Sequence, residues 1–175
     1  PESKSTAPAL SAAVHYLDSI NIEKDQPILF LPSDHLFTRG SNLILELKKL
    51  AESKFNENII LLGVKPEYPE PDYGYIKFKP SSKRLKEIEK FTEKPELKLA
   101  RRLFKNSKYL WNSGIFLGKQ KTFMGLMEKY YQDNNIVRDS VMDSVISTEG
   151  KVNYILLSKA FSEVLKVSFD EAILE

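Results

Sequence analysis

Residues 27–35 read Pro-Ile-Leu-Phe-Leu-Pro-Ser-Asp-His, and the rest of the chain is best interpreted from this stretch outward. The four large apolar residues at 28–31 predict a strand that is buried on both faces of a sheet. Pro32 ends the run, because proline fixes its own φ and donates no hydrogen bond to a sheet ladder. Asp34 and His35 therefore follow the carboxyl end of the strand, which is the edge where open α/β sheets bind their ligands.

The local sequence leaves two roles open for Asp34. A carboxylate at the ligand-binding edge is a candidate ligand for a metal ion or a hydroxyl group. Alternatively, Asp34 caps the next helix, since aspartate is a favoured N-cap residue. The chain has only two histidines. His35 is expected to orient its loop, and His15 lies in a helical pattern, where a structural role is expected.

Composition narrows the class of protein. With 175 residues, the chain is predicted to form a single domain, 1–175, around one sizeable core. The formal net charge of +2 favours neither a nucleic-acid nor a membrane partner. The absence of cysteine excludes a disulfide framework, a thiolate zinc site and a cysteine nucleophile. No apolar run approaches the roughly 20 residues that cross a bilayer, and the first residues lack a signal-peptide pattern, so we expect a soluble cytoplasmic protein.

The segments on either side of residues 27–35 predict a β-α-β unit. A helix with Ser5 or Thr6 as its N-cap, Pro8 in its first turn and its end near Asn21 precedes the first strand. An amphipathic helix around 43–50 and a second buried strand at 58–63 follow it. Strands joined by such a crossover are expected to be parallel.

The rest of the chain continues this alternation of helices and strands. After a proline-rich loop, we predict half-buried strands at 75–79 and 85–91, a helix at 96–104, a strand at 109–117, surface-packed helices at 122–131 and 136–146, a strand at 153–157 and a last helix capped by Ser168 or Asp170. Asn112-Ser113-Gly114 interrupts the strand at 109–117. Glycine inside a strand pattern is typical of a bulge or of a ligand that approaches the backbone.

Four loop clusters lie at the ends of predicted strands or interrupt one. They are Asp34-His35, Tyr73-Gly74-Tyr75, Glu93-Lys94-Pro95 and Trp111-Asn112-Ser113-Gly114. Each alone is weak evidence of a site. Glu93 and Lys94 could form a solvated ion pair, Asn112 could be a turn residue, and Trp111 could be a core aromatic whose N–H is satisfied.

In this order, the clusters resemble the mannose-1-phosphate guanylyltransferase family of sugar-phosphate nucleotidyltransferases. The matching segments run from the first residue to the last. They are residues 1–9 (the family's Asn-Thr-Ala-Pro-Ala), 31–35 (Leu-Pro-Ala-Asp-His), 72–76 (Thr-Gly-Tyr-Gly-Tyr-Ile), 91–95 (Phe-Val-Glu-Lys-Pro), 109–116 (Tyr-x-Trp-Asn-Ser-Gly-Met-Phe) and 168–175 (Ser-Ile-Asp-Tyr-Ala-Val-Met-Glu).

The resemblance implies a Rossmann-like, three-layer α/β fold of the glycosyltransferase-A-like kind, with a mixed, mostly parallel sheet. It also implies an enzyme that transfers GMP from GTP to mannose 1-phosphate, giving GDP-mannose and pyrophosphate. Asp34 and Asp170 would hold Mg²⁺, and Lys94 would meet the 1-phosphate of the sugar. These three are the implied catalytic residues.

The implied substrate-binding residues are Ser5 and Thr6 beside the guanine, and Glu93, Asn112 and the backbone of Gly74 around the sugar hydroxyls. Ser5 stands where the family has asparagine. Elementary chemistry agrees with these roles, because Mg²⁺ usually takes one or two carboxylates together with waters and substrate phosphates. Lysine binds phosphate as a point charge, while glutamate and asparagine supply the acceptors and donors that a hexose needs.

The largest departure from the family is that the glycine-rich Gly-x-Gly-x-Arg loop that holds the triphosphate does not occur in the chain. The chain also ends inside the helix that contains Asp170, so the C-terminal part of the family is expected to be missing as well. We therefore expect a nucleotidyltransferase domain truncated at its N-terminus, either an excised fragment or a decayed remnant. It is expected to fold, to self-associate through exposed sheet edge and apolar surface, and to show no transfer activity alone. Two alternatives stay open: an enzyme of the same type with another base or sugar, and a non-catalytic module that retains the sugar pocket for binding or scaffolding.

Overall fold

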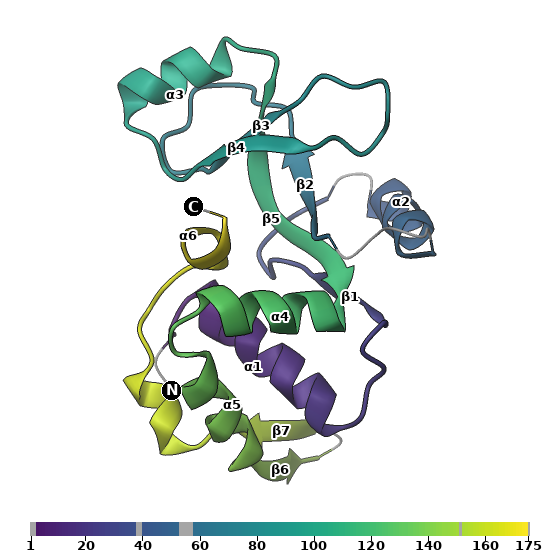
Figure 1. Ribbon diagram of the computed structural model, residues 1–175, viewed down its shortest axis with the longest axis vertical. Coiled ribbons are helices and arrows are strands. Elements are labelled where there is room, and N and C mark those ends of the chain that lie inside the picture. Colours follow the sequence, from purple (N-terminus) through teal and green to yellow (C-terminus); the bar gives the residue numbers. More distant parts are fainter. Residues whose placement is uncertain (1–2, 38–39, 53–57, 151, 175) are drawn as a thin grey trace. The chain divides into compact units, whose positions relative to one another are not determined.

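The computed structural model describes residues 3–37, 40–52, 58–150 and 152–174. It divides into two compact units. The first unit holds the two ends of the described chain, up to Ile28 and from Gly118 onward, together with Asn58, and the second holds most of the middle. The chain mixes helices with strands that occur singly or in runs of up to three, which confirms the α/β class (Figure 1).

The sheet is organised around the long strand β5 (Tyr109–Lys119). The strand order is β1-β5-β3-β4, and β2 also pairs with β5. The other strands are β1 (Pro27–Phe30), β2 (Ile60–Val64), β3 (Tyr75–Phe78) and β4 (Ile88–Thr92). The β2–β5, β3–β5 and β3–β4 ladders are antiparallel. These are three of the four pairings in the sheet, so the expectation of a mostly parallel sheet is wrong for the described ladders, and the parallel orientation of β1 and β2 stays a prediction.

The first apolar strand forms where the sequence predicts it, but the prediction that it is buried on both faces is wrong. Leu29 in β1 is 37% exposed and Leu31 just beyond it is 53% exposed. A run of apolar residues indicates that a strand is suited to burial. The strand is buried only where other elements pack against both of its faces, and the sequence of the strand does not reveal whether they do. The predicted helix that follows, α2 (Gly40–Glu52), buries only Leu47 among its described side chains.

The core of the second unit lies under α3 (Leu97–Phe104), the helix predicted at 96–104. Its buried members are Tyr75, Ala100, Leu103 and Trp111, with Tyr109 packed against them. Opposite β5, the register shifts between Leu61 and Gly63, which confirms the predicted irregularity at Asn112-Ser113-Gly114. The proline-rich loop at 65–72 is also confirmed, and the Tyr75 hydroxyl anchors it through hydrogen bonds with the backbone of Glu70.

The first unit is built around helix α1 (Thr6–Ser19), which contacts three other helices (Figure 1). They are α4 (Gln120–Tyr130), α5 (Asn134–Met142) and α6 (Phe169–Ile173). Phe123, Met127 and Val137 are fully buried, so the expectation that α4 and α5 are packed only on the surface is wrong. Core positions recur at helical spacing on both helices, which is the pattern of an internal face.

The helix predicted at 136–146 is shorter than expected. It ends at Met142, and Val145–Glu149 forms strand β6, which pairs with β7 (Val152–Leu156) in a separate two-stranded sheet. The β-branched residues of β6 explain the difference, since they lose side-chain freedom in a helix and suit a strand. A 3₁₀ helix, η1 (Lys159–Glu163), follows the hairpin. Within the described ranges, no helix has the length and apolar character that a membrane span requires.

Candidate active site

Three of the implied sugar-binding residues meet across three neighbouring strands, Gly74 just before β3, Glu93 just after β4 and Asn112 within β5. Tyr75 in β3 pairs with Thr92 in β4 on one side and with Trp111 in β5 on the other. The residues beside these partners, Glu93 and Asn112, therefore flank Gly74. The Asn112 N–H donates a hydrogen bond of 2.8 Å to the Gly74 carbonyl oxygen. The register of the sheet thus brings together clusters that are well separated in the sequence.

A side chain at position 74 would crowd two neighbouring side chains. A Cβ atom there would lie 2.8 Å from Glu93 Oε2 and 2.8 Å from the Phe91 ring. The missing side chain lets the Glu93 carboxyl group approach the strand end, where its side chain is only 13% exposed. Glu93 Oε1 lies 3.5 Å from the ammonium group of Lys94, which is 58% exposed. Glu93 and Lys94 therefore form an ion pair, as the sequence suggested, but only the Lys94 ammonium group is well exposed to solvent, while the Glu93 carboxylate is largely shielded.

The backbone at Lys94 has an unusual conformation. Its φ of 34° is positive, which is uncommon for a residue with a side chain. Such strain persists where the surrounding structure imposes it, and it is frequent at ligand sites. Pro95, which follows directly, is buried and helps to fix the turn into α3.

Side-chain hydrogen bonds hold the irregular part of β5. Asn112 Oδ1 accepts from the Gly114 N–H at 3.1 Å, and Ser113 Oγ donates to the Leu62 carbonyl oxygen at 2.7 Å. Gly114 has a φ of 68°, which glycine adopts without strain. A Cβ atom on Gly114 would lie 3.3 Å from Pro32 Cγ, so the turn after β1 packs against this bulge.

Asp34 lies exposed in that turn. The alternative that it caps the next helix is wrong, because α2 begins only at Gly40. The ring of His35 lies edge-on to Phe37 with centroids 5.9 Å apart, a contact that agrees with a role in shaping the loop. The carboxylate of Asp34 is thus placed at the strand end and is open to a ligand.

In the first unit, the starts of α1 and α6 lie side by side. Thr6 Oγ1 accepts a hydrogen bond of 2.8 Å from the Phe169 N–H, and the Ala7 N–H donates to the Val167 carbonyl oxygen at 3.2 Å. Ser5 precedes α1 with a φ of 70° and makes no side-chain cap. Asp170 occupies the first turn of α6, half-buried, so Ser5, Thr6 and Asp170 belong to one local arrangement.

The cap of α6 settles one alternative that the sequence left open. Ser168, not Asp170, is its N-cap, and it forms a capping box with Glu171. Asp34 and Asp170 belong to different units, and their joint binding of Mg²⁺ stays a prediction. The described residues contain no group of three or more histidine, aspartate or glutamate side chains that could hold a metal ion.

The aromatic surroundings of Trp111 were not predicted. Tyr68 and Tyr73 lie edge-on to the indole, with centroids 5.0 and 5.2 Å away. Electrostatic repulsion by Tyr73 is the largest cause that raises the pKa of Tyr68. The Trp111 N–H has no hydrogen-bond partner in the described part of the chain, so the expectation of a satisfied N–H is wrong. The sequence indicated this cluster only through the presence of Tyr68 in the proline-rich loop and of Tyr73 just after it.

The close packing at Gly74 leads to a stability prediction. Gly74→Ala is expected to destabilise the protein by about 1–3 kcal/mol, because the added methyl group must displace Glu93 or Phe91. Gly125→Ala in α4 is the matched control, since a Cβ atom there meets nothing within 4 Å. In a helix, this control should stabilise by about 0.5–1 kcal/mol. Urea unfolding followed by circular dichroism measures both, and a neutral Gly74→Ala would contradict the packing described.

Comparisons with known proteins match the chain to one family over most of its length. A family model described as nucleotidyl transferase matches residues 1–154. Mannose-1-phosphate guanylyltransferase from Escherichia coli is 29% identical over 185 residues, covering 100% of this chain and 38% of that protein. Xanthan biosynthesis protein XanB from Xanthomonas campestris pv. campestris (strain B100) is 28% identical over 176 residues, covering 100% of this chain and 36% of that protein.

A solved structure shows the same fold. The crystal structure described as mannose-1-phosphate geranyltransferase from Thermus thermophilus matches with a TM-score of 0.81 and 23% sequence identity, covering 100% of this chain and 48% of that one. The expected Rossmann-like nucleotidyltransferase fold is thereby confirmed. The chain spans little more than a third of the length of the relatives named above. Because the family model covers most of the 175 residues, the chain belongs to the nucleotidyl transferase family.

Proposed function

We propose that the protein to which this chain belongs transfers GMP from GTP to mannose 1-phosphate. The products are GDP-mannose and pyrophosphate. The observation that carries the proposal is that Gly74, before β3, and Glu93 and Lys94, after β4, lie beside Asn112 within β5. This arrangement offers hydrogen-bonding groups for sugar hydroxyls beside an accessible cation for a phosphate. The sugar and the base are taken from the name of the Escherichia coli relative.

The residues around Gly74 would orient the sugar phosphate. The shielded Glu93 carboxylate accepts hydrogen bonds from sugar hydroxyls, and the Asn112 carboxamide donates to others. Lys94 places its ammonium group on the 1-phosphate of the sugar and neutralises part of the charge of that phosphate. The sugar phosphate can then approach the phosphates of the nucleotide. Ser5 and Thr6 would lie beside the guanine. Thr6 Oγ1 already accepts from the Phe169 N–H, so its hydroxyl hydrogen remains as a donor for the base.

The reaction is a displacement at phosphorus. An oxygen of mannose 1-phosphate attacks the α-phosphorus of GTP, the bond from that phosphorus to the bridging oxygen breaks, and pyrophosphate leaves. Asp34 and Asp170 are hard oxygen donors of the kind that Mg²⁺ accepts, and they would hold the ion. When bound, Mg²⁺ neutralises charge on the phosphates. The protein's contribution is positioning and preorganised charge, which dominate phosphoryl-type transfer.

The direct test uses the full-length protein. Incubation with GTP, mannose 1-phosphate and Mg²⁺ should release pyrophosphate, and omission of either substrate should abolish release. A panel of nucleoside triphosphates and sugar 1-phosphates distinguishes the alternative of another base or sugar. No release with any pair, accompanied by measurable binding of a sugar nucleotide, would favour the non-catalytic module instead.

Lys94→Ala tests the placement of the sugar phosphate. Loss of one charged contact typically costs about 1.5–3 kcal/mol, so the KM for mannose 1-phosphate should rise roughly 10–100-fold while the KM for GTP changes less. Lys90→Ala, an exposed lysine in β4, is the control and removes the same charge. Steady-state kinetics with each substrate varied in turn measures both constants. An equal rise for both substrates would place Lys94 at the triphosphate.

A further inference from the structure

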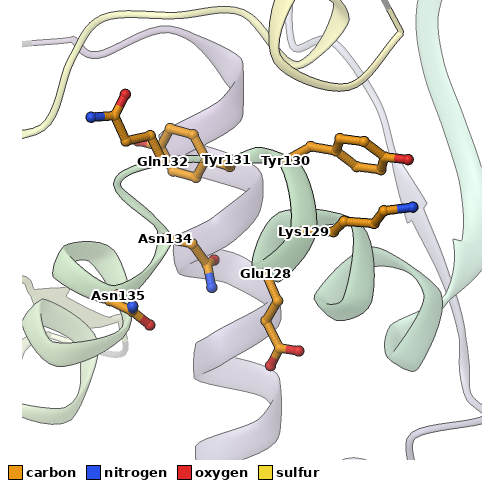
Figure 2. A pocket seen from close by; sticks show the side chains of 7 residues that line it. All are labelled: Glu128, Lys129, Tyr130, Tyr131, Gln132, Asn134 and Asn135. Atoms are coloured by element: carbon orange, nitrogen blue, oxygen red, sulfur yellow. The ribbon is translucent and has the colours of Figure 1, made fainter.

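The first unit contains a pocket that the proposed reaction does not use. It has a volume of about 350 Å³ and lies where α4 ends and α5 begins. This is the lower end of the roughly 300–1,000 Å³ that is typical of small-molecule sites. Figure 2 shows the lining side chains, which are Glu128, Lys129, Tyr130, Tyr131, Gln132, Asn134 and Asn135. None of them is among the residues assigned above to the sugar phosphate, the nucleotide or Mg²⁺.

One lining residue, Asn134, is held by a buried polar network. Ser11 Oγ donates to Asn134 Oδ1 at 2.9 Å, and His15 Nε2 lies 3.0 Å from the same oxygen. Ser11 is fully buried, and His15 and Asn134 are 5% and 4% exposed. Burying three polar side chains is costly unless they bond one another, so the network fixes this carboxamide firmly.

The network leaves one half of the carboxamide available. With Oδ1 shared by Ser11 and His15, the Nδ2 group of Asn134 makes no hydrogen bond within the described part of the chain. Nδ2 is also absent from the buried side-chain atoms that lack a partner. Asn134 lines the pocket, and Nδ2 is the part of its carboxamide that can donate to a ligand there. His15, expected from the sequence to be structural, positions this donor group.

The rest of the lining favours a neutral, polyhydroxylated ligand. Glu128 and Lys129 carry opposite charges, and the Lys129 ammonium group lies 4.7 Å from the centre of the Tyr130 ring. Burial is the main cause that raises the pKa of Tyr131 to about 12, so this residue is uncharged at neutral pH. Gln132 and Asn135 add exposed amides that both donate and accept. A balanced charge and several amides suit hydroxyl groups better than they suit an anion.

We propose that this pocket binds a neutral monosaccharide, with Asn134 Nδ2 donating to a sugar hydroxyl oxygen and the half-exposed Tyr130 ring packing against the sugar. The proposal is independent of the proposed function, because it rests on other residues and needs neither nucleotide nor metal. The pocket would let a free sugar bind to the first unit. Its expected affinity is modest, on the order of millimolar, because the pocket is open and few groups converge.

The test is a titration of the ¹⁵N-labelled 175-residue chain followed by NMR. The probes are the methyl α-glycosides of mannose, glucose and galactose, with inorganic phosphate as the anionic comparison. At least one glycoside should give saturable shifts of the Asn134 side-chain NH₂ signals and of residues 128–135. Phosphate should leave the Asn134 signals unmoved. Absence of saturable shifts with all three glycosides, or equal shifts with phosphate, overturns the proposal.

Two variants sharpen this test. Tyr130→Ala should weaken glycoside binding about fivefold, the effect of losing one aromatic contact. Tyr154→Ala is the matched control, because Tyr154 lies in β7 and is 46% exposed, close to the 50% of Tyr130. This control should bind as the unmodified chain does. Equal affinity of both variants, or saturable shifts that spare the Asn134 NH₂ signals, would show that the sugar does not bind as proposed.

Discussion

Asp34→Asn in the full-length protein is expected to lower the rate of pyrophosphate release by about 10²-fold or more, the typical cost of losing one preorganised electrostatic group at a reacting centre. The substitution keeps the size of the side chain and removes one anionic oxygen. Asp34 is exposed in the turn after β1, so the change should leave folding intact. The prediction rests on the proposed role of Asp34 as a Mg²⁺ ligand.

The dependence of the rate on the Mg²⁺ concentration distinguishes a role of Asp34 as a metal ligand from other roles of this residue. Loss of a ligand should raise the Mg²⁺ concentration needed for half-maximal rate, and saturating Mg²⁺ should restore only part of the rate. Asp143→Asn is the control, since it removes the same charge from an exposed residue just after α5 and should leave kinetics unchanged. Full activity of Asp34→Asn at saturating Mg²⁺ would exclude the assignment.

Local sequence signals predicted most elements of the fold. Apolar periodicity and proline placement located β1, α3, β5 and α4 to within a few residues, because these patterns act over short stretches of chain. The boundary between α5 and β6 was missed, since Val145 and Ile146 continue an apolar pattern that a helix could also use. Burial of β1 was overestimated for another reason. The exposure of Leu29 depends on which elements cover β1, and the local sequence pattern does not determine which elements these are.

The sequence allowed the residues of the candidate site to be named, but it did not show how they are arranged in space. The clusters at Gly74, Glu93 and Asn112 could be named from their motifs, but only the antiparallel register of β3, β4 and β5 shows that they meet. The pocket around Asn134 had no such signal. Its positioning partners, Ser11 and His15, lie 123 and 119 residues away in the sequence. Contacts of that separation depend on how α1 and α5 pack, which single-sequence patterns do not determine.

Phe169, the residue before Asp170, packs α6 against its neighbours. It is fully buried, and its ring centroid lies 6.2 Å from that of Phe123 in α4. The Phe169 N–H also bonds Thr6 Oγ1 at the start of α1. Helix α6 has only five residues, too few to be stable by itself, so its placement comes from this packing.

Phe169→Ala is therefore expected to destabilise the protein by about 3–5 kcal/mol, through lost burial and the cavity left beside Phe123. That is a large part of the roughly 5–15 kcal/mol that stabilises a typical domain. Phe169→Leu keeps most of the volume and should cost less than about 1.5 kcal/mol, while Tyr154→Ala on the exposed hairpin should stay within about 0.5 kcal/mol. Urea unfolding of the three variants measures this order. If Phe169→Ala unfolds at the same urea concentration as Tyr154→Ala, α6 is held by other contacts, and Asp170 owes its position to the Ser168 cap instead.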